Sequence, residues 1–281
     1  MTIAPLAVAQ DFATSFKATV VTDGIYMLDG EDGFGGGNVG LLVGDEYVVL
    51  IDDAMVPTAP ALLAAALDLA GRPIDFVINT HVHGDHVGGN ELMANGGAIV
   101  VAHDNIRKRM QGDPELATSP GALPVLTFSD AVTFHVNGNE AEVFHIETAH
   151  TDGDAAIHFR NVNVMFAGDV MFNGLFPYID LDNGGTVAGY IAGQKKLIAM
   201  IDDDTTIIPG HGPLGKKVAL ERNLAVLIDS QARVKALVDK GMSEEDIVVA
   251  NPLALYHDDY NWGFITTERM TRTLIRSLTS E

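Results

Sequence analysis

A dense run of metal-binding side chains lies about one third of the way along the chain. Three histidines and one aspartate occur between positions 81 and 86: His81, His83, Asp85 and His86. They directly follow Asp75–Asn79, whose apolar residues predict a short buried strand. Imidazole nitrogen and carboxylate oxygen are ligands that zinc accepts without any thiolate. This run therefore predicts a metal site at the end of that strand.

The spacing within the run favours two metals. His81 and His83 alternate, so on an extended chain both side chains point to the same face and reach one metal. Gly84 permits a turn that would carry Asp85 and His86 toward a second metal. The alternative is a histidine-rich loop without metal, and the density of ligand types in this short run disfavours it.

The composition limits both the kind of site and the kind of partner. The chain has 281 residues and no cysteine, which excludes thiolate zinc sites and cysteine nucleophiles. A formal net charge of −21 disfavours nucleic acid and anionic membrane surfaces as partners. No apolar run approaches the roughly 18 residues of a membrane span. We therefore expect a small-molecule substrate, and the oligomeric state stays open.

The N-terminus has a composition of its own. Residues 4–10 are similar to the end of a secretory signal with an Ala-Val-Ala cleavage site, although the basic region and the full apolar core are missing. We expect residues 1–17 to be a flexible N-terminal segment or a signal remnant. A periplasmic or secreted location is slightly favoured over a cytoplasmic one.

The elements that must position the ligands alternate between strands and helices. A helix is predicted at Ala59–Ala70, with Thr58 as N-cap and Gly71 ending it, and its apolar surface places it against a sheet. Helical spacing dominates residues 215–281, with a helix start at Ser243. Further strands are predicted at Ala18–Leu28, Val39–Ile51, Ala98–Ala102, Ala131–Val136, Ala141–Ile146, Ala155–Arg160, Val162–Ala167 and Thr206–Pro209, and short helices at Asn105–Met110 and Thr267–Leu278.

Three later segments complete a family pattern. They are Ile146–Asp154, which contains His150; Phe166–Asp169; and Ile208–Pro213, which contains His211. Together with the histidine run, they resemble the ligand motifs of the metallo-β-lactamase superfamily over about residues 24–213. The resemblance implies an αβ/βα four-layer sandwich, with the metals at one edge between the sheets. We expect residues 18–281 to form this single domain.

The resemblance also implies the ligand set. His81, His83 and His150 would bind the first zinc; Asp85, His86 and His211 would bind the second; and Asp169 would bridge both. Iron and manganese remain alternatives to two zinc ions. Asp52 is similar to an aspartate that orients one of the ligand histidines. Residues 169–180 and 262–265 are most similar to the SoxH-like and glyoxalase-II-like branch with a bridging aspartate.

The implied activity is hydrolysis of a small ester, thioester, lactam or phosphodiester by a hydroxide held between two metals. Asp85 is the candidate to relay a proton to the leaving group. β-Lactam hydrolysis, as a main or a secondary activity, is one alternative. A non-catalytic metal sensor or scaffold is another, although a structural zinc site closes at about four ligands.

Several other features have two interpretations. The segment Phe172–Tyr178 is either core or a pocket wall, and Gly33–Asn38 is either a plain turn or a mobile flap, which we favour. Asp180 and Asp182 are expected to be solvated loop residues. The remaining histidines are expected to have packing or surface roles: His103, His135, His145, His158 and His257.

Overall fold

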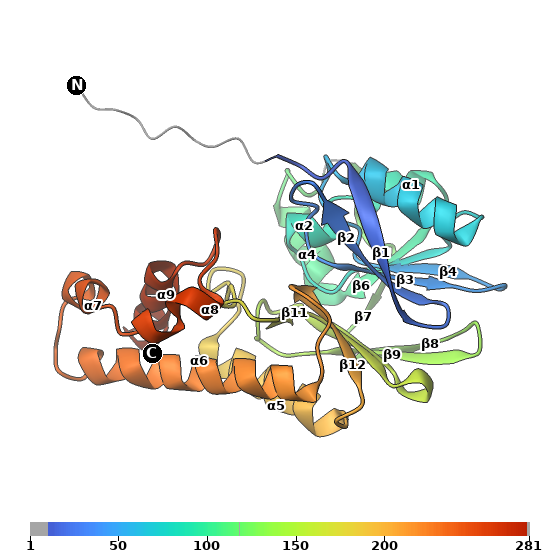
Figure 1. Cartoon of the computed structure of the whole chain (residues 1–281). Helices are drawn as coiled ribbons and strands as arrows, with labels where there is room; N and C mark the ends of the chain where they lie inside the picture. Colours follow the sequence, from blue (N-terminus) through green and yellow to red (C-terminus); the bar gives the residue numbers. More distant parts are fainter. Residues whose placement is uncertain (1–10, 118, 280–281) are drawn as a thin grey trace.

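The computed structural model describes residues 11–117 and 119–279, with two β-sheets packed face to face (Figure 1). The strands of the first sheet lie in sequence order: β1 (Ser15–Thr22), β2 (Ile25–Glu31), β3 (Val39–Val43), β4 (Val48–Ile51), β5 (Phe76–Ile78), β6 (Ile99–His103) and β7 (Leu126–Phe128). Strands β1 to β4 pair antiparallel, and β4 to β7 pair parallel. The carboxyl ends of β4, β5 and β6 therefore share one edge.

The second sheet has the order β12-β11-β10-β9-β8. Its strands are β8 (Ala131–Val136), β9 (Asn139–His145), β10 (Ala155–Phe159), β11 (Val164–Phe172) and β12 (Thr206–His211). β11 and β12 run parallel, while the other neighbours pair antiparallel. Every residue of β11 is buried, as expected for a strand covered on both faces.

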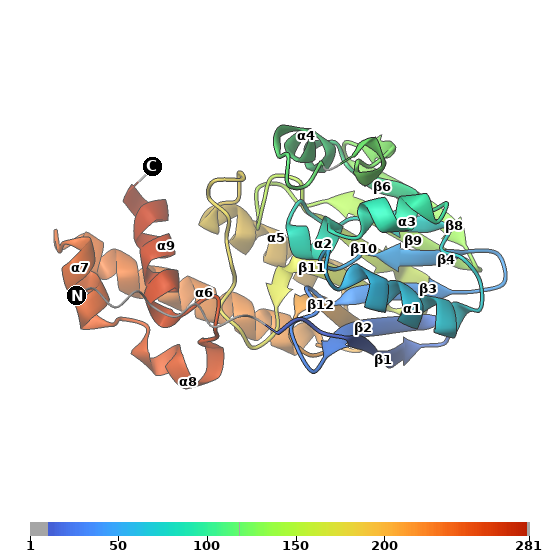
Figure 2. The same ribbon diagram turned by 90° about the horizontal axis from the view of Figure 1, so that it is seen from above.

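Helices flank both sheets, and the last helices of the chain lie to one side of the sandwich (Figure 2). Those of the first half are α1 (Ala59–Ala70), α2 (Gly84–Val87), α3 (Asn90–Asn95) and α4 (Asp104–Gly112); those of the second half are α5 (Val187–Met200), α6 (Lys217–Val238), α7 (Glu244–Ala250), α8 (His257–Tyr260) and α9 (Thr267–Thr279). α1 packs on the first sheet and α5 on β11. These layers confirm the predicted αβ/βα sandwich.

Alternation along the strands explains this layering. In β4, Val49 and Ile51 belong to the core between the sheets, whereas Val48 and Leu50 belong to the core beneath α1. Side chains of a strand alternate between its two faces, so a strand with apolar residues at every position buries both faces. Leu62 of α1 packs into this outer core.

The C-terminal helices share one hydrophobic core with the outer face of the second sheet. Met270, Leu274 and Ile275 of α9 are buried in the same cluster as Phe172 of β11. Ser243 caps α7 as predicted, because its side chain accepts a hydrogen bond from Asp246 N. Within the described residues, no helix is both long and apolar enough to cross a membrane.

Some sequence expectations differ from the structure. The expected strand Ala18–Leu28 is two strands, β1 and β2, which turn at Gly24 with a φ of 70°. The stretch Val39–Ile51 is likewise two strands. Thr58 makes no capping hydrogen bond with its side chain; its Oγ1 instead donates to the carbonyl of Gly35 at 2.6 Å. α1 itself has its predicted bounds and ends at a left-handed Gly71.

The N-terminal expectation falls only partly on described residues. The sequence similar to a secretory signal, residues 4–10, lies outside the described part of the chain. Strand β1 begins at Ser15, inside the segment expected to be terminal, and pairs with β2 from Ser15 onward. Helix α5 was not expected from the sequence.

Candidate metal centre

The candidate ligands come from both sheets and meet at one edge. His81 and His83 lie just beyond the end of β5, in the loop that enters α2, and not on a regular strand as expected. His150 lies in the loop between β9 and β10. Asp169 lies within β11 and His211 ends β12. The sandwich thus brings together residues separated by up to 130 positions of sequence (81 to 211).

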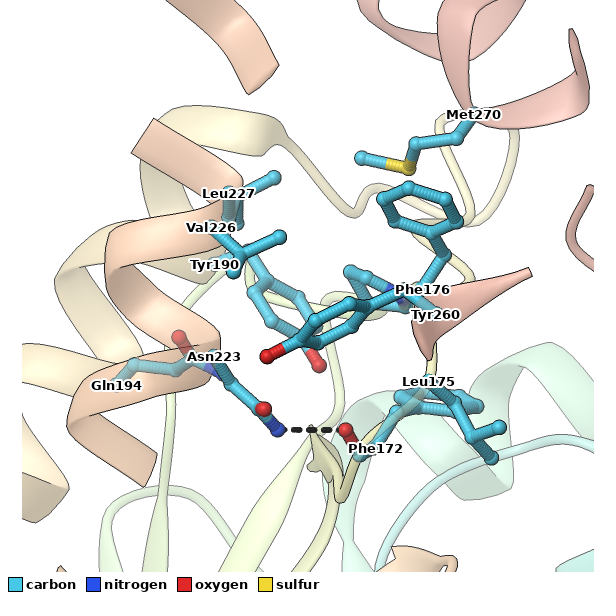
Figure 3. Close-up of a pocket in the computed structure, with 11 residues that line it drawn as sticks. Phe172, Leu175, Phe176, Tyr190, Gln194, Asn223, Val226, Leu227, Tyr260 and Met270 are labelled. Carbon is cyan, nitrogen blue, oxygen red and sulfur yellow. Dashed lines mark hydrogen bonds between the residues drawn. The ribbon is translucent and has the colours of Figure 1, made fainter. Parts of the chain in front are cut away.

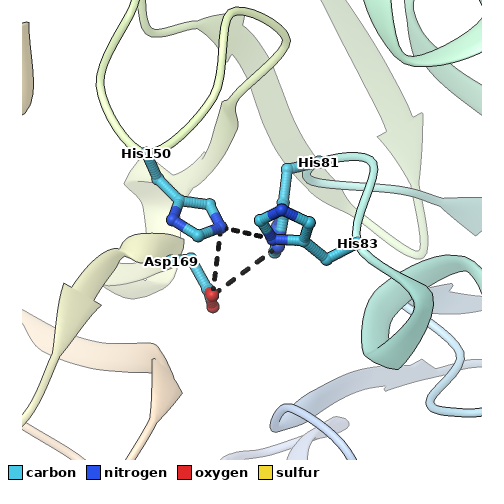
Figure 4. A group of neighbouring side chains, drawn as sticks. All are labelled: His81, His83, His150 and Asp169. Carbon is cyan, nitrogen blue, oxygen red and sulfur yellow. Dashed lines mark hydrogen bonds and ion pairs between the residues drawn. The ribbon is translucent and has the colours of Figure 1, made fainter. Parts of the chain in front are cut away.

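The first ligand group consists of His81, His83, His150 and Asp169, which point toward one another (Figure 4). One ligand atom from each lies within 4.8 Å of the others. Nε2 of His150 is 2.7 Å from Nδ1 of His83 and 3.3 Å from the Asp169 carboxylate. Nε2 of His81 is 3.6 Å from the same carboxylate.

The second ligand group consists of Asp85, His86 and His211, again with ligand atoms within 4.8 Å of one another. Nε2 of His211 is 3.3 Å from Asp85 Oδ2, and Nε2 of His86 is 3.5 Å from it. Asp169 joins the two groups: its Oδ1 is 3.3 Å from His86 Nε2, while its Oδ2 contacts His150 and is 3.6 Å from His211.

The hydrogen bonds behind the rings set which nitrogen carries a lone pair toward the centre. His150 donates from Nδ1 to the carbonyl of Tyr178 at 2.7 Å. His83 donates from Nε2 to Asp180 at 2.8 Å. His150 Nε2 and His83 Nδ1 are thereby left as two acceptors facing each other at 2.7 Å. Such an arrangement is repulsive unless a cation lies between them.

The second group repeats this pattern. His86 donates from Nδ1 to Asp52 at 2.8 Å, which leaves its Nε2 as an acceptor. Among the described residues, buried atoms without any hydrogen-bond partner include His81 Nε2, His86 Nε2 and Asp169 Oδ1. Buried polar atoms rarely lack a partner, and these three all face the two groups. The donor set therefore fits divalent cations held by nitrogen and oxygen.

The pKa values agree with that fit. Burial lowers the pKa of His81 well below its usual range and that of His150 to about 3, so both rings are neutral at pH 7. Burial also opposes protonation of His211, but Asp169 and Asp85 outweigh it and raise the pKa of His211 to about 9. The second group thus carries a negative field that attracts a cation.

Asp52 holds the histidine loop from behind. It accepts hydrogen bonds from His86 Nδ1, from the backbone N of Thr80 at 2.7 Å and from the Thr80 hydroxyl at 2.7 Å. Its backbone φ is 64°, an uncommon conformation for a residue other than glycine. The backbone N of Asp52 donates to Ile78 O at 2.9 Å, which ties this turn to β5.

Two further supporting residues were not identified from the sequence. Asp180, expected to be a solvated loop residue, is buried and accepts the hydrogen bond of His83. Asp154 is fully buried and accepts hydrogen bonds from the backbone N of His150 at 2.6 Å and from Thr151. Burial raises the pKa of Asp154 to about 8. Asp182, in contrast, is exposed and pairs with Arg276.

Strand β11 extends past its neighbour β10, and residues of helices α5 and α6 hold its end (Figure 3). Tyr190 of α5 donates to the carbonyl of Asp169 at 2.9 Å, and Gln194 donates to that of Val170 at 3.0 Å. Asn223 of α6 donates to the carbonyl of Phe172 at 2.5 Å. Side chains thus provide hydrogen bonds to backbone carbonyls of β11 that lie beyond its pairing with β10.

Close approach of β12 to β11 requires a glycine beside the shared carboxylate. A Cβ atom added at Gly210 would lie 1.9 Å from Asp169 Oδ1. The loop between β2 and β3 makes a similar approach, because a Cβ at Gly37 would lie 2.1 Å from the His86 ring. Asn38 anchors this loop by donating to Pro209 O and Gly212 O at 2.9 and 2.8 Å.

The aromatic segment after Asp169 is partly core, and two of its rings contact candidate ligands. Phe172 and Phe176 are buried in the core. The Phe172 ring also stacks on His211 at 5.0 Å, and the half-buried Tyr178 stacks on His83 at 5.4 Å.

The other histidines stand apart from both ligand groups. His103 and His145 stack on each other, with ring centroids 3.8 Å apart. His135 is exposed on β8. His158 is buried on β10, and His257 contacts Thr267.

Known proteins share both the sequence pattern and the fold. A hydroxyacylglutathione hydrolase from Methylococcus capsulatus is 32% identical over 136 residues, covering 46% of this chain and 48% of that protein. One from a Synechococcus strain is 30% identical over 193 residues, covering 59% and 64%. The chain thus spans about half the length of the first of these curated relatives. The solved metallo-beta-lactamase from Pontibacter korlensis superposes with a TM-score of 0.66 at 18% identity, covering 76% of this chain and all of that one.

The family model of the metallo-beta-lactamase superfamily matches residues 32–211, well over half of the chain. This range contains all seven candidate ligands. It begins in the β2–β3 region and ends at the last residue of β12. The chain belongs to the metallo-beta-lactamase superfamily.

Proposed function

We propose that this protein is a metal-dependent hydrolase that holds two zinc ions in the two ligand groups. The observation that carries the proposal is the position of Asp169, whose carboxylate lies between the two groups: it is 3.3 Å from His150 Nε2 in the first group and 3.3 Å from His86 Nε2 in the second. A carboxylate placed in this way would be shared by two cations. A site that served structure alone would close around one ion with about four ligands.

The donor set favours zinc. Each group offers imidazole nitrogens and carboxylate oxygen, which zinc accepts in tetrahedral sites. Iron or manganese in the same groups would be a different outcome of metal analysis. When bound, two such cations supply a strong Lewis acid and make water acidic enough to ionise near neutral pH.

The surrounding residues hold this arrangement and move protons. Asp52 and Asp180 fix the rings of His86 and His83 through the nitrogens that face away from the centre. Asp85 is the candidate for proton relay. Burial alone would raise its pKa, but His86 and His211 outweigh burial and hold it well below the ordinary value. The ionised Asp85 can therefore accept a proton from the attacking water and pass it to the leaving group.

The substrate class follows from chemistry and from the relatives. A small ester, thioester, lactam or phosphodiester presents the carbonyl or phosphoryl group that such a centre attacks. The curated relatives are named hydroxyacylglutathione hydrolases, which supports a thioester as the first substrate to test. A net charge of −21 supports a small molecule over nucleic acid.

The test combines metal content with turnover. Metal analysis of the purified protein should give two equivalents of zinc per chain. A panel of a hydroxyacylglutathione, a nitrophenyl ester, a cephalosporin and bis-nitrophenyl phosphate should show turnover that EDTA abolishes and zinc restores. Metal bound without turnover on any member of the panel would support a scaffold instead. One equivalent or less would contradict the two-metal proposal.

A further inference from the structure

One edge of the metal centre is open to solvent. The side chains of Asp85 and His83 are 22% and 19% exposed, and that of His211 is 10% exposed. The side chains of His81, His86 and His150 are at most 1% exposed. A substrate therefore reaches the centre across Asp85, His83 and His211.

Aromatic rings border this open edge on both sides. The ring of His211 lies nearly parallel to those of Phe34 and Phe172, with centroids 6.4 and 5.0 Å away, and Trp262 lies 5.9 Å from it. The ring of His83 stacks on Tyr178 at 5.4 Å.

Trp262 and Phe264 connect the two sides. Their rings are 5.7 Å apart, and Phe264 meets Tyr178 edge-on at 5.3 Å. Both residues come from the segment between α8 and α9. This segment follows the residues that match the family model, which end at 211. Tyr178, Trp262 and Phe264 thus form an aromatic wall. Phe264 is 47% exposed, so this part of the wall is open to a ligand.

The wall is held in place from behind. Trp262 Nε1 donates to the carbonyl of Phe176 at 2.9 Å. The guanidinium of Arg269 lies 4.0 Å over the Phe264 ring and donates to the Phe264 carbonyl at 3.0 Å. Aromatic rings fixed in this way bind a flat apolar group with little further loss of side-chain freedom.

We propose that Trp262 and Phe264 determine specificity by packing against an aromatic ring carried by the acyl part of the substrate. This inference rests on the proposed hydrolase function. Asp85, which would serve the leaving group, lies under the β2–β3 loop, where its carbonyl accepts a hydrogen bond from Gly37 N at 3.2 Å. We assign the leaving group to the side of that loop and the acyl group to the side of His83, whose ring stacks on Tyr178 next to Phe264.

The substrates are arylacyl esters or thioesters. In the reaction, the bond between the acyl carbon and the oxygen or sulfur breaks. Water supplies a hydroxyl group to the acyl carbon, and a proton goes to the released alcohol or thiol. The product is an arylacyl carboxylate whose ring still lies against the wall, so a simple carboxylate of this kind is a probe of the wall.

The chain contains a single tryptophan, Trp262, so tryptophan fluorescence reports on this part of the site, which includes the neighbouring ring of His211 at 5.9 Å. The metal-loaded protein is titrated with phenylacetate and, separately, with acetate, which shares the carboxylate but lacks the ring. We expect phenylacetate to change the emission with a saturable dependence and to bind at least tenfold more tightly than acetate. Equal responses to the two anions would overturn the proposal.

Variants locate the contact. Phe264→Ala should weaken phenylacetate binding about three- to tenfold, as expected for loss of one aromatic contact, and leave acetate binding unchanged. Phe264→Leu should retain part of the affinity. Val249→Ala, at an exposed site on α7, is the matched control and should bind like the unaltered chain. Unchanged phenylacetate affinity in Phe264→Ala would refute the assignment.

The two proposals fail separately. Selective phenylacetate binding without turnover on any ester or thioester would contradict the hydrolase function while supporting the wall. Turnover that is equal for acetyl and phenylacetyl esters of the same alcohol, with equal anion binding, would support the hydrolase and overturn the aromatic specificity.

Discussion

Asp180 and His83 are 97 residues apart in the sequence, and 2.8 Å separate the Asp180 carboxylate from Nε2 of His83. Burial would raise the pKa of Asp180, but His83 and Asn183 outweigh it and lower the pKa below its ordinary value, so the carboxylate is charged. A charged acceptor at Nε2 keeps the proton there and leaves Nδ1 free for a metal. The contact therefore sets both the tautomer and the direction of this ring.

Removing that acceptor should weaken the first metal site. We expect Asp180→Ala to lower zinc affinity about 10- to 100-fold, the usual cost of losing a residue that orients a ligand histidine. Competition with a chromogenic chelator measures the affinity, and circular dichroism checks the fold. Asp182→Ala in the same loop is the control, because Asp182 is exposed and its carboxylate pairs with Arg276. Equal affinities in the two variants would exclude this role for Asp180.

Loss of a ligand from the second group should remove the second zinc ion and leave the first bound. We expect His86→Ala to bind one equivalent of zinc instead of two and to lose activity, because His86 offers a buried, unpartnered Nε2 to the second group only. Asp169→Ala should affect both equivalents, since its carboxylate contacts both groups. Mass spectrometry under native conditions counts the ions. His135→Ala, at an exposed position on β8, should retain two.

The hydroxyl of Tyr190 should stabilise the strand that carries Asp169. Tyr190→Phe leaves the carbonyl of Asp169 buried without this donor, and we expect the free energy of unfolding to fall by about 1–2 kcal/mol. Denaturant titration of the metal-free protein measures it. Tyr256→Phe removes a hydroxyl that donates to the exposed Asp229, and should cost about 0.5 kcal/mol or less. If both variants lost the same free energy of unfolding, burial of the Asp169 carbonyl would not explain the effect of Tyr190→Phe.

Stability should depend on pH through His145. Burial and the stacked His103 lower the pKa of His145, so the unfolded chain binds this proton more readily than the folded one. The contribution of His145 is therefore complete above the unfolded pKa of about 6.5 and is lost as the pH falls below it. The free energy of unfolding of the metal-free protein is measured between pH 5 and 8 at intervals of ~0.5 pH unit. On the acid side, it should fall less steeply with decreasing pH in His145→Gln than in the unaltered chain. Parallel slopes would argue against this coupling.

Motifs that act locally could be predicted from the sequence. α1 has its predicted bounds because an apolar run ends at a glycine that adopts a left-handed conformation. The histidine run predicts a metal site because several ligand types are concentrated next to a buried strand, and the structure brings these side chains together. Ser243 caps α7 through a hydrogen bond within one turn. In each case the controlling contacts lie within a few residues.

The unpredicted features depend on contacts between distant segments. α5 lacks a clear apolar pattern and contains glycines, which disfavour helices. Those glycines are required because a neighbouring segment leaves no room for a side chain. A Cβ at Gly189 would lie 2.1 Å from Thr148 O, and one at Gly193 would lie 2.7 Å from Ile146. Asp180 likewise resembles any loop aspartate until the fold brings His83 to it.

The placement of the ligands on two sheets has a mechanical consequence. His81, His83 and His86 follow strand β5 of the first sheet, whereas Asp169 lies within β11 and His211 ends β12, both in the second sheet. Bound cations would therefore cross-link the two halves of the sandwich, in a chain that has no cysteine for a disulfide. Separation of the two halves and release of the ions would be one event. The rate of metal dissociation and the rate of unfolding should therefore be limited by the same free-energy barrier.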